Sequence, residues 1–221
     1  MAASTPRPRS ARGSAATRVS TPPDSYARLF RAAVAEFSER GYDGARVDRI
    51  AEEARINKAM LYYHFTSKQG LYQEVIREMV RAVGARVRAI ADGPGTAQER
   101  LDAWVDAVVE EAAARPWFPP IMLHELAAGA PHLDADTFAL MNGIHLAVRD
   151  ILVEGQRCRE FRDVDPLLTY FTIMPPILMF FARERVRVRA KTHTPLIARR
   201  SRQQFVTHMQ ASIRGMLRKD G

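Results

Sequence analysis

Apolar residues recur at helical spacing along most of this chain, and no segment shows the sustained apolar–polar alternation of a β-strand. One apolar stripe consists of Val47, Ile50, Ala51 and Ala54. Positions i, i+3, i+4 and i+7 lie on one side of an α-helix, so this stripe predicts a short helix. After a turn at residues 55–57, Leu61 and Phe65 mark the buried side of a second short helix. Such a pair forms a helix-turn-helix unit, whose second helix could enter the major groove of DNA.

Capping signals indicate where helices begin, because short polar side chains can accept hydrogen bonds from free backbone amides. The predicted caps are Asp24 or Ser25, Asn57, Ser67, the capping box of Thr96 with Glu99, and Asp134. Gly41 fits the position that ends the first helix. Further helices are expected at about residues 68–91, 120–128 and 197–218.

Residues 166–182 contain no charged side chain. The arginines that follow are Arg183, Arg185, Arg187 and Arg189. A membrane span with a positive flank has this pattern, but spanning needs about 20 residues, and this segment is at the short limit. Pro175 and Pro176 also interrupt it, and each proline removes a backbone donor and clashes one turn back. We therefore expect a buried helix that is kinked near Met174.

The second helix of the helix-turn-helix unit presents polar and cationic groups on its outward side. Phenol hydroxyls and ammonium groups bind phosphate oxygens and fix the register of a protein on duplex DNA. The residues that we expect at the DNA are Arg46, Lys58, Ala59, Met60, Tyr62, Tyr63, His64 and Lys68. Lys58 and Met60 are expected to influence base preference, whereas Tyr62 and Lys68 are expected to contact phosphates. The alternative is an ordinary helical hairpin with amphipathic tyrosines on its surface.

Residues 26–75 resemble the TetR family of bacterial transcriptional regulators. The matching positions are Ala33, Phe37, Gly41, Tyr42, Ile50, Ala51, the run from Leu61 to Phe65, Lys68 and Leu71. Three positions depart from the family pattern. Arg55 occupies the usual glycine position of the turn, where a left-handed conformation would cost about 1 kcal/mol. Ala59 and Met60 replace a small or hydroxyl pair, and Gly70 stands where glutamate is frequent.

The resemblance implies an all-α fold in two domains. Residues 24–70 would form an N-terminal three-helix helix-turn-helix DNA-binding domain, and residues 71–221 a C-terminal helical ligand-binding and dimerisation domain. The family architecture also implies a homodimer in which the last two helices pair with their copies. The residues that we assign to that interface are Ile173, Ile177, Phe205, Met209, Ile213 and Met216.

Aromatic and methionine residues are dense between residues 96 and 182. Small-molecule sites are usually mostly apolar cavities with a few polar groups. The residues that we expect to bind a ligand are Trp104, Phe118, Met122, Phe138, Met141, His145, Phe171 and Met174. For each of them the alternative is plain hydrophobic core.

The net charge of +8 is unevenly distributed along the 221 residues. Residues 1–23 carry four arginines and no acid, and they have no apolar period, which predicts a disordered basic arm. Such an arm could follow DNA phosphates or serve only as a solvated leader. Residues 183–221 contribute +9, which leaves −5 for residues 24–182. A basic chain is consistent with nucleic-acid binding, but this distribution does not locate the binding surface.

Several classes of chemistry have no support in the sequence. Cys158 is the only cysteine, which excludes an internal disulfide and a four-cysteine zinc site. His124 and Glu125 lack the second histidine of a zinc-protease helix, and no glycine-rich phosphate loop or nucleophile elbow occurs. We therefore expect no enzyme, no metal and no cofactor. The N-terminus has no charged-then-apolar leader, which predicts a cytoplasmic protein.

These patterns and the resemblance together predict a ligand-responsive transcriptional regulator that does not enter a membrane. Its partners would be a double-stranded operator, a small effector and a second copy of the chain. The simplest form is a repressor that a small apolar or aromatic effector releases from a palindromic operator. An activator of the same fold is one alternative, and a helical small-molecule-binding enzyme is another.

Overall fold

The computed structural model describes residues 22–189 and 200–219, and all regular structure in these residues is α-helical. The helices are α1 (Pro22–Gly44), α2 (Val47–Glu53), α3 (Lys58–His64), α4 (Lys68–Ala91), α5 (Ala97–Ala114), α6 (Phe118–Ala127), α7 (Ala135–Arg157), α8 (Pro166–Arg189) and α9 (Arg202–Leu217). The all-α prediction is therefore confirmed. The predicted basic arm lies outside the described residues, except for Pro22 and Pro23 at the start of α1.

Most of the predicted helix ends are confirmed by the hydrogen bonds of the caps. Asn57 accepts from the amide of Met60 at 2.8 Å, and Ser67 accepts from Gly70 at 3.0 Å. Further caps with this geometry are the Thr96–Glu99 box and Asp134. Each pairs a backbone N–H that no helical carbonyl can reach.

The start of α1 differs from the prediction. The helix begins at Pro22, since proline fits the first turn, where its missing N–H removes no helical hydrogen bond. Ser25 is consequently not a cap but a buried residue inside α1. The predicted end at Gly41 is confirmed in the backbone, because Gly41 leaves the helical conformation with φ 67° and ψ −176°. A helical segment then continues to Gly44.

Two later helix starts also shift, and the two prolines expected to interrupt the apolar segment lie inside one helix. α6 starts at Phe118, because Pro119 and Pro120 occupy its first turn and do not break it. α8 continues as a single helix through Pro175 and Pro176. Its Pro166–Glu184 portion is long and apolar enough to cross a membrane by length and composition alone. α9 starts at Arg202, after the Ser201–Gln204 capping box.

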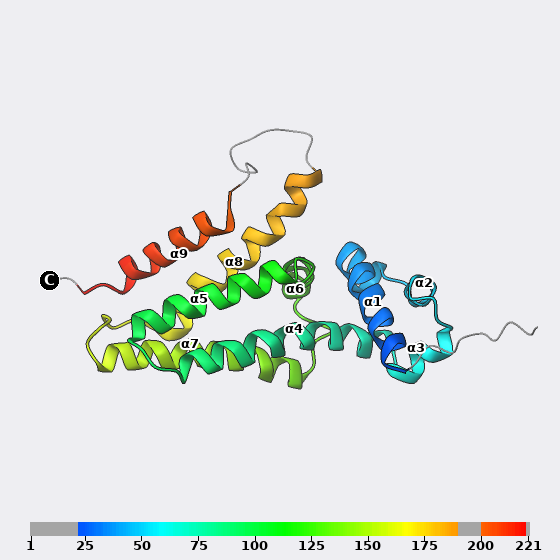
Figure 1. The fold of residues 1–221 in the computed structure, drawn as a ribbon, viewed down its shortest axis with the longest axis horizontal. Coiled ribbons are helices and arrows are strands. Elements are labelled where there is room, and N and C mark those ends of the chain that lie inside the picture. The colour runs from blue at the N-terminus through cyan, green and yellow to red at the C-terminus, as the bar shows by residue number, and fades with distance from the viewer. Residues whose placement is uncertain (1–21, 190–199, 220–221) are drawn as a thin grey trace, which may run out of the picture.

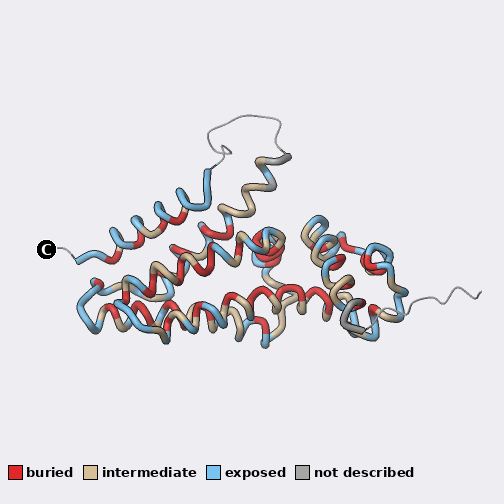
Figure 2. The backbone as a smooth tube through the Cα atoms, viewed as in Figure 1, coloured by how far each residue is buried: buried red, intermediate tan, exposed pale blue. Residues whose placement is uncertain are grey.

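Two groups of helices share α4. Figure 1 shows α1, α2 and α3 gathered at one end, with α4 leading away from them alongside α5 and α7. α5 also contacts α8 and α9, and the short α6 touches α1, α4 and α8. The buried positions in Figure 2 lie on the faces that these helices turn toward one another. α4 passes through the predicted domain boundary at residues 70 and 71, so one continuous helix connects the two groups of helices.

Candidate functional site

The α2–α3 unit has the backbone geometry of a tight helix-turn-helix. α2 ends at Glu53 with Ala54 as its C-cap, and Arg55 then takes a left-handed conformation with φ 53°. The amide of Ile56 returns to the carbonyl of Ala51 at 3.0 Å, which closes the turn before the Asn57 cap. Arg55 therefore holds the strained position that the sequence pattern would give to glycine.

The inner face of α3 is fixed against α1 and α2. Leu61 is fully buried and Phe65 is 7% exposed. His64 turns inward as well, since its Nε2 lies 3.3 Å from the hydroxyl of Ser25 and its ring contacts Tyr26 edge-on. His64 thus helps to orient α3, and it is less available to DNA than its position on the helix indicated.

The outer face of α3 is open to solvent. Tyr62 and Tyr63 are 47% and 81% exposed, and Lys58 and Ala59 are also exposed. Met60 is half-buried. These five predicted DNA-contacting residues are therefore brought together on one exposed short helix.

Three cationic residues near this face have partners within the protein. The Nζ of Lys58 lies 2.5 Å from a carboxylate oxygen of Asp48, and this hydrogen bond raises the pKa of Lys58. Lys68 sits at the start of α4 with its Nζ 4.5 Å from the centre of the Tyr42 ring. Arg46 is exposed, and its backbone amide donates to Glu36 at 3.0 Å. The DNA role of each stays a prediction.

A cavity of about 370 Å³ lies in the second group of helices, with walls from α4, α5, α6, α7 and α8. Seven of the eight predicted ligand-binding residues line it: Phe118, Met122, Phe138, Met141, His145, Phe171 and Met174. Trp104 does not line it and is fully buried in the core behind it, where its ring meets Tyr170 edge-on. The sequence missed Tyr170 and α4's Val80 and Val83, because a helical stripe does not show which of its members face a void.

The polar groups of the cavity wall are few. Asn142, His145 and Tyr170 are its lining residues with polar side-chain atoms, and Asp, Glu, Lys and Arg are missing from the described lining. The His145 Nε2 is buried without a hydrogen-bond partner among the described residues. Burial raises the pKa of Tyr170 to about 12, so its hydroxyl is neutral and able to donate.

A buried polar cluster joins the two groups of helices beside this cavity. Glu125 of α6 is 1% exposed, and its carboxylate accepts from the hydroxyl of Tyr72 in α4 at 2.9 Å. It also accepts from the backbone amide of His132 at 2.8 Å, and the His132 Nδ1 lies 3.1 Å away. The His132 ring in turn packs 3.7 Å from that of Tyr42, centre to centre. We call Glu125, Tyr72, His132 and Tyr42 the junction cluster.

The junction cluster is not evident from the sequence pattern. The feature of the sequence that could have indicated it is Glu125, an acidic residue three and four positions after the buried Met122 and Ile121 and therefore on the same face of the helix. The cluster lies between α6, whose Met122 lines the cavity, and α1, which supports α3. Burial and the Glu125 carboxylate raise the pKa of Tyr72, which keeps its hydroxyl protonated as the donor.

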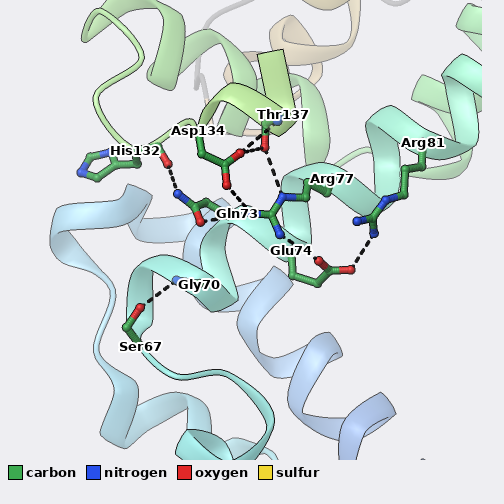
Figure 3. A network of polar contacts seen from close by, with 9 residues as sticks. All are labelled: Ser67, Gly70, Gln73, Glu74, Arg77, Arg81, His132, Asp134 and Thr137. Carbon is green, nitrogen blue, oxygen red and sulfur yellow. Dashed lines mark hydrogen bonds and ion pairs between the residues drawn. The ribbon is translucent and has the colours of Figure 1, made fainter. Parts of the chain in front are cut away.

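The segment after α6 is tied to α4 by a second set of contacts, shown in Figure 3. Gln73 donates to the His132 carbonyl at 2.9 Å, and Arg77 pairs with Asp134, the cap of α7. Hydrogen bonds from the Thr137 side chain and amide, with the Arg77 charge, lower the pKa of Asp134 to about 2. Glu74 binds both Arg77 and Arg81 on the same face. α4 is therefore held to α6 and α7 along its first half.

Four of the six predicted dimer-interface residues are buried inside the protomer, which corrects that assignment. Ile173 and Ile177 of α8 are fully buried, and Ile177 lines the cavity. Met209 and Ile213 of α9 are 8% and 3% exposed on the side of the helix that packs on α5. Phe205 and Met216 are half-buried. The apolar stripes were identified correctly, but they are covered by the chain's own helices.

The opposite face of α8 is apolar and open. The large side chains there that are more than half exposed are Leu168, Phe171, Met179 and Val186. No group of three or more metal-binding side chains occurs in the described part of the chain.

Comparisons with known proteins match this geometry. The sequence model of the protein family described as "Bacterial regulatory proteins, tetR family" matches residues 29–75, which run from α1 into α4. The HTH-type transcriptional repressor SCO4008 of Streptomyces coelicolor is 36% identical over 95 residues, which are 43% of this chain and 46% of that protein. The negative regulator IcaR of the Staphylococcus aureus biofilm operon icaADBC is 49% identical over 45 residues, 20% of this chain and 24% of IcaR. The chain spans less than half the length of these curated relatives.

The fold similarity extends much further than the sequence similarity. The ketosteroid transcriptional regulator KstR2 of Mycobacterium tuberculosis superposes with a TM-score of 0.69 at 25% identity, over 88% of this chain and 95% of KstR2. The aligned region includes the second group of helices, so this group shares the fold of that regulator at 25% identity over the whole alignment.

Proposed function

We propose that this chain is a ligand-responsive DNA-binding regulator of the TetR family, a proposal that the match of residues 29–75 to the model of that family supports. Its simplest form is a repressor that leaves its operator when a small apolar or aromatic effector binds. Acting on an operator, it would work in the cytoplasm.

The observation that carries the proposal is that α4 belongs to both sites. Its first turn follows the exposed recognition helix α3, and its Met79, Val80 and Val83 line the cavity. A ligand changes DNA affinity only if it binds two conformations unequally. A ligand that displaces α4 or α6 would alter the junction cluster, and hence the support of α3.

We further propose that the regulator is a homodimer joined through the open apolar face of α8 at Leu168, Met179 and Val186, which leaves Phe171 at the mouth of the cavity. Exposed apolar patches of this kind mark interaction surfaces. A dimer presents two copies of α3, which must be about 34 Å apart to enter successive major grooves. The effector would favour a spacing that cannot place both copies in the grooves.

Selection of genomic fragments by the full-length protein, followed by fluorescence anisotropy on the recovered site, tests DNA binding. Ala59→Glu places a carboxylate on the exposed first turn of α3, where it suits the helix dipole but repels phosphates. We expect this variant to keep the parent's unfolding temperature and to lose operator binding. Ala59→Gln, whose side chain has nearly the shape of the glutamate in Ala59→Glu but no charge, should retain most of the operator affinity. Equal operator affinity for Ala59→Glu and the parent would contradict the proposed interface.

A further inference from the structure

The cavity is lined almost entirely by apolar groups, and its open side is apolar too. Four lining residues are large, apolar and 45% to 59% exposed, so the cavity meets solvent among them: Leu126, Phe138, Leu167 and Phe171. A molecule that enters between these side chains leaves water for an apolar surface. Methionines from four helices, Met79, Met122, Met141 and Met174, form part of the wall, and their flexible side chains can adapt to the bound shape.

The wall offers no counter-charge to a charged ligand. Lys, Arg, Asp and Glu are absent from the lining, as far as the chain is described. A carboxylate or ammonium group would lose its hydration on entering without gaining an ion pair, which is a large free-energy cost. The cavity volume of about 370 Å³ is near the lower end of the range of roughly 300–1,000 Å³ for small-molecule sites.

One polar atom of the wall lacks a partner. His145 lines the cavity, and its Nε2 is buried with no hydrogen-bond partner among the described residues. Its ring is held edge-on against Tyr170, with 5.4 Å between the ring centres. A buried polar atom without a partner is costly, and a ligand that supplies the missing hydrogen bond removes that cost.

We propose that the effector is an uncharged, mostly apolar molecule of small size, with a single hydrogen-bonding group that pairs with the His145 Nε2. This inference rests on the proposed function only in naming the ligand an effector. The site and the class of ligand follow from the cavity itself. An imidazole nitrogen donates or accepts according to its tautomer, so a hydroxyl, phenol or carbonyl would each satisfy it.

Three probes with one apolar body test the class: 4-butylphenol, butylbenzene and 4-butylbenzoate. Binding to the full-length protein without DNA is measured by calorimetry and by the shift in unfolding temperature. A net hydrogen bond of ordinary strength predicts that the phenol binds about 3- to 10-fold more tightly than butylbenzene. The benzoate should bind at least about tenfold more weakly than the phenol, because its charge is desolvated without a partner.

His145→Phe keeps an aromatic ring, somewhat larger than imidazole, and removes both ring nitrogens. It should reduce the phenol's affinity to that of butylbenzene and leave butylbenzene binding unchanged or slightly tighter. His208→Phe, at an exposed position on α9, is the matched control and should bind all three probes as the parent does. Butylbenzene binding by His145→Phe also reports that the cavity is intact in that variant.

The proposal is overturned if the benzoate binds most tightly, if no probe binds, or if the phenol's advantage persists in His145→Phe. The regulatory function is judged separately, by adding a bound probe to the operator complex. A probe that binds as expected without changing operator affinity would refute the effector role of this ligand class and leave the binding site in place.

Discussion

Tyr72→Phe is the sharpest test of the junction cluster, because it removes one oxygen atom and little else. The Tyr72 hydroxyl donates to the buried Glu125 carboxylate at 2.9 Å, and the side chain is 1% exposed. Its ring contacts, edge-on to Phe37 and Tyr42, are available to phenylalanine as well. The substitution therefore isolates a single hydrogen bond to a charged acceptor.

The expected loss in the free energy of unfolding depends on which hydrogen bonds Glu125 keeps in Tyr72→Phe. A hydrogen bond to a charged group contributes about 1.5–3 kcal/mol, and its loss leaves a buried carboxylate oxygen less satisfied. The His132 amide and Nδ1 remain as donors at 2.8 and 3.1 Å, so the carboxylate keeps part of its stabilisation. We expect the free energy of unfolding to fall by about 2 kcal/mol.

Urea denaturation followed by circular dichroism measures this change. Protein concentration must be held fixed, since the stability of the proposed dimer would depend on it. Tyr63→Phe is the matched control, because its hydroxyl is on a side chain 81% exposed and surface changes usually stay within about 0.5 kcal/mol. A lower midpoint with an unchanged slope is expected for Tyr72→Phe. If Tyr72→Phe loses no more than Tyr63→Phe, Glu125 does not depend on this hydrogen bond and our account of the junction is wrong.

Three further changes probe other parts of the molecule. The pKa of Asp134 is lowered to about 2, so its charge stabilises the fold above about pH 4, and this contribution is lost as pH falls toward 2. Because the Asp134 side chain is 34% exposed and partly screened by solvent, Asp134→Asn should lower the free energy of unfolding at pH 7 by about 1 kcal/mol, measured by urea denaturation. The difference in stability between Asp134→Asn and the parent should disappear below about pH 4. A difference that grows in acid would contradict this account. Arg55→Gly relieves a left-handed residue at φ 53° and should raise the free energy of unfolding by about 0.5–1 kcal/mol, and a loss of stability would show that the turn carries no strain. Leu168→Glu, at a position 67% exposed on α8, should give a monomer in sedimentation velocity, whereas the control Val153→Glu on α7 should remain a dimer. A dimer that persists when Leu168→Glu is combined with a charged residue at Met179 would show that this face of α8 is not the dimer interface.

The helices and their ends were determined largely by local sequence. Asn57, Ser67, Thr96 and Asp134 cap helices in the structure as predicted, because a cap depends on atoms within about four residues along the chain. The exposed face of α3 was predictable for the same reason, since Leu61 and Phe65 fix which side is buried. Seven of the eight expected cavity residues were also identified, because a cluster of aromatic and methionine residues is itself a local feature of the composition.

Tertiary structure alone decided which helix covers each apolar stripe. Met209 and Ile213 form a stripe that a second copy or the chain's own α5 could cover, and helical periodicity is the same in both cases. The same holds for Trp104, whose spacing marks it as buried but not whether it faces a cavity. The junction cluster joins residues from positions 42 to 132, and its hydrogen bonds exist only after α1, α4 and α6 have packed. Short-range patterns fix helices and their faces, whereas contacts between residues distant in sequence depend on how those faces are paired.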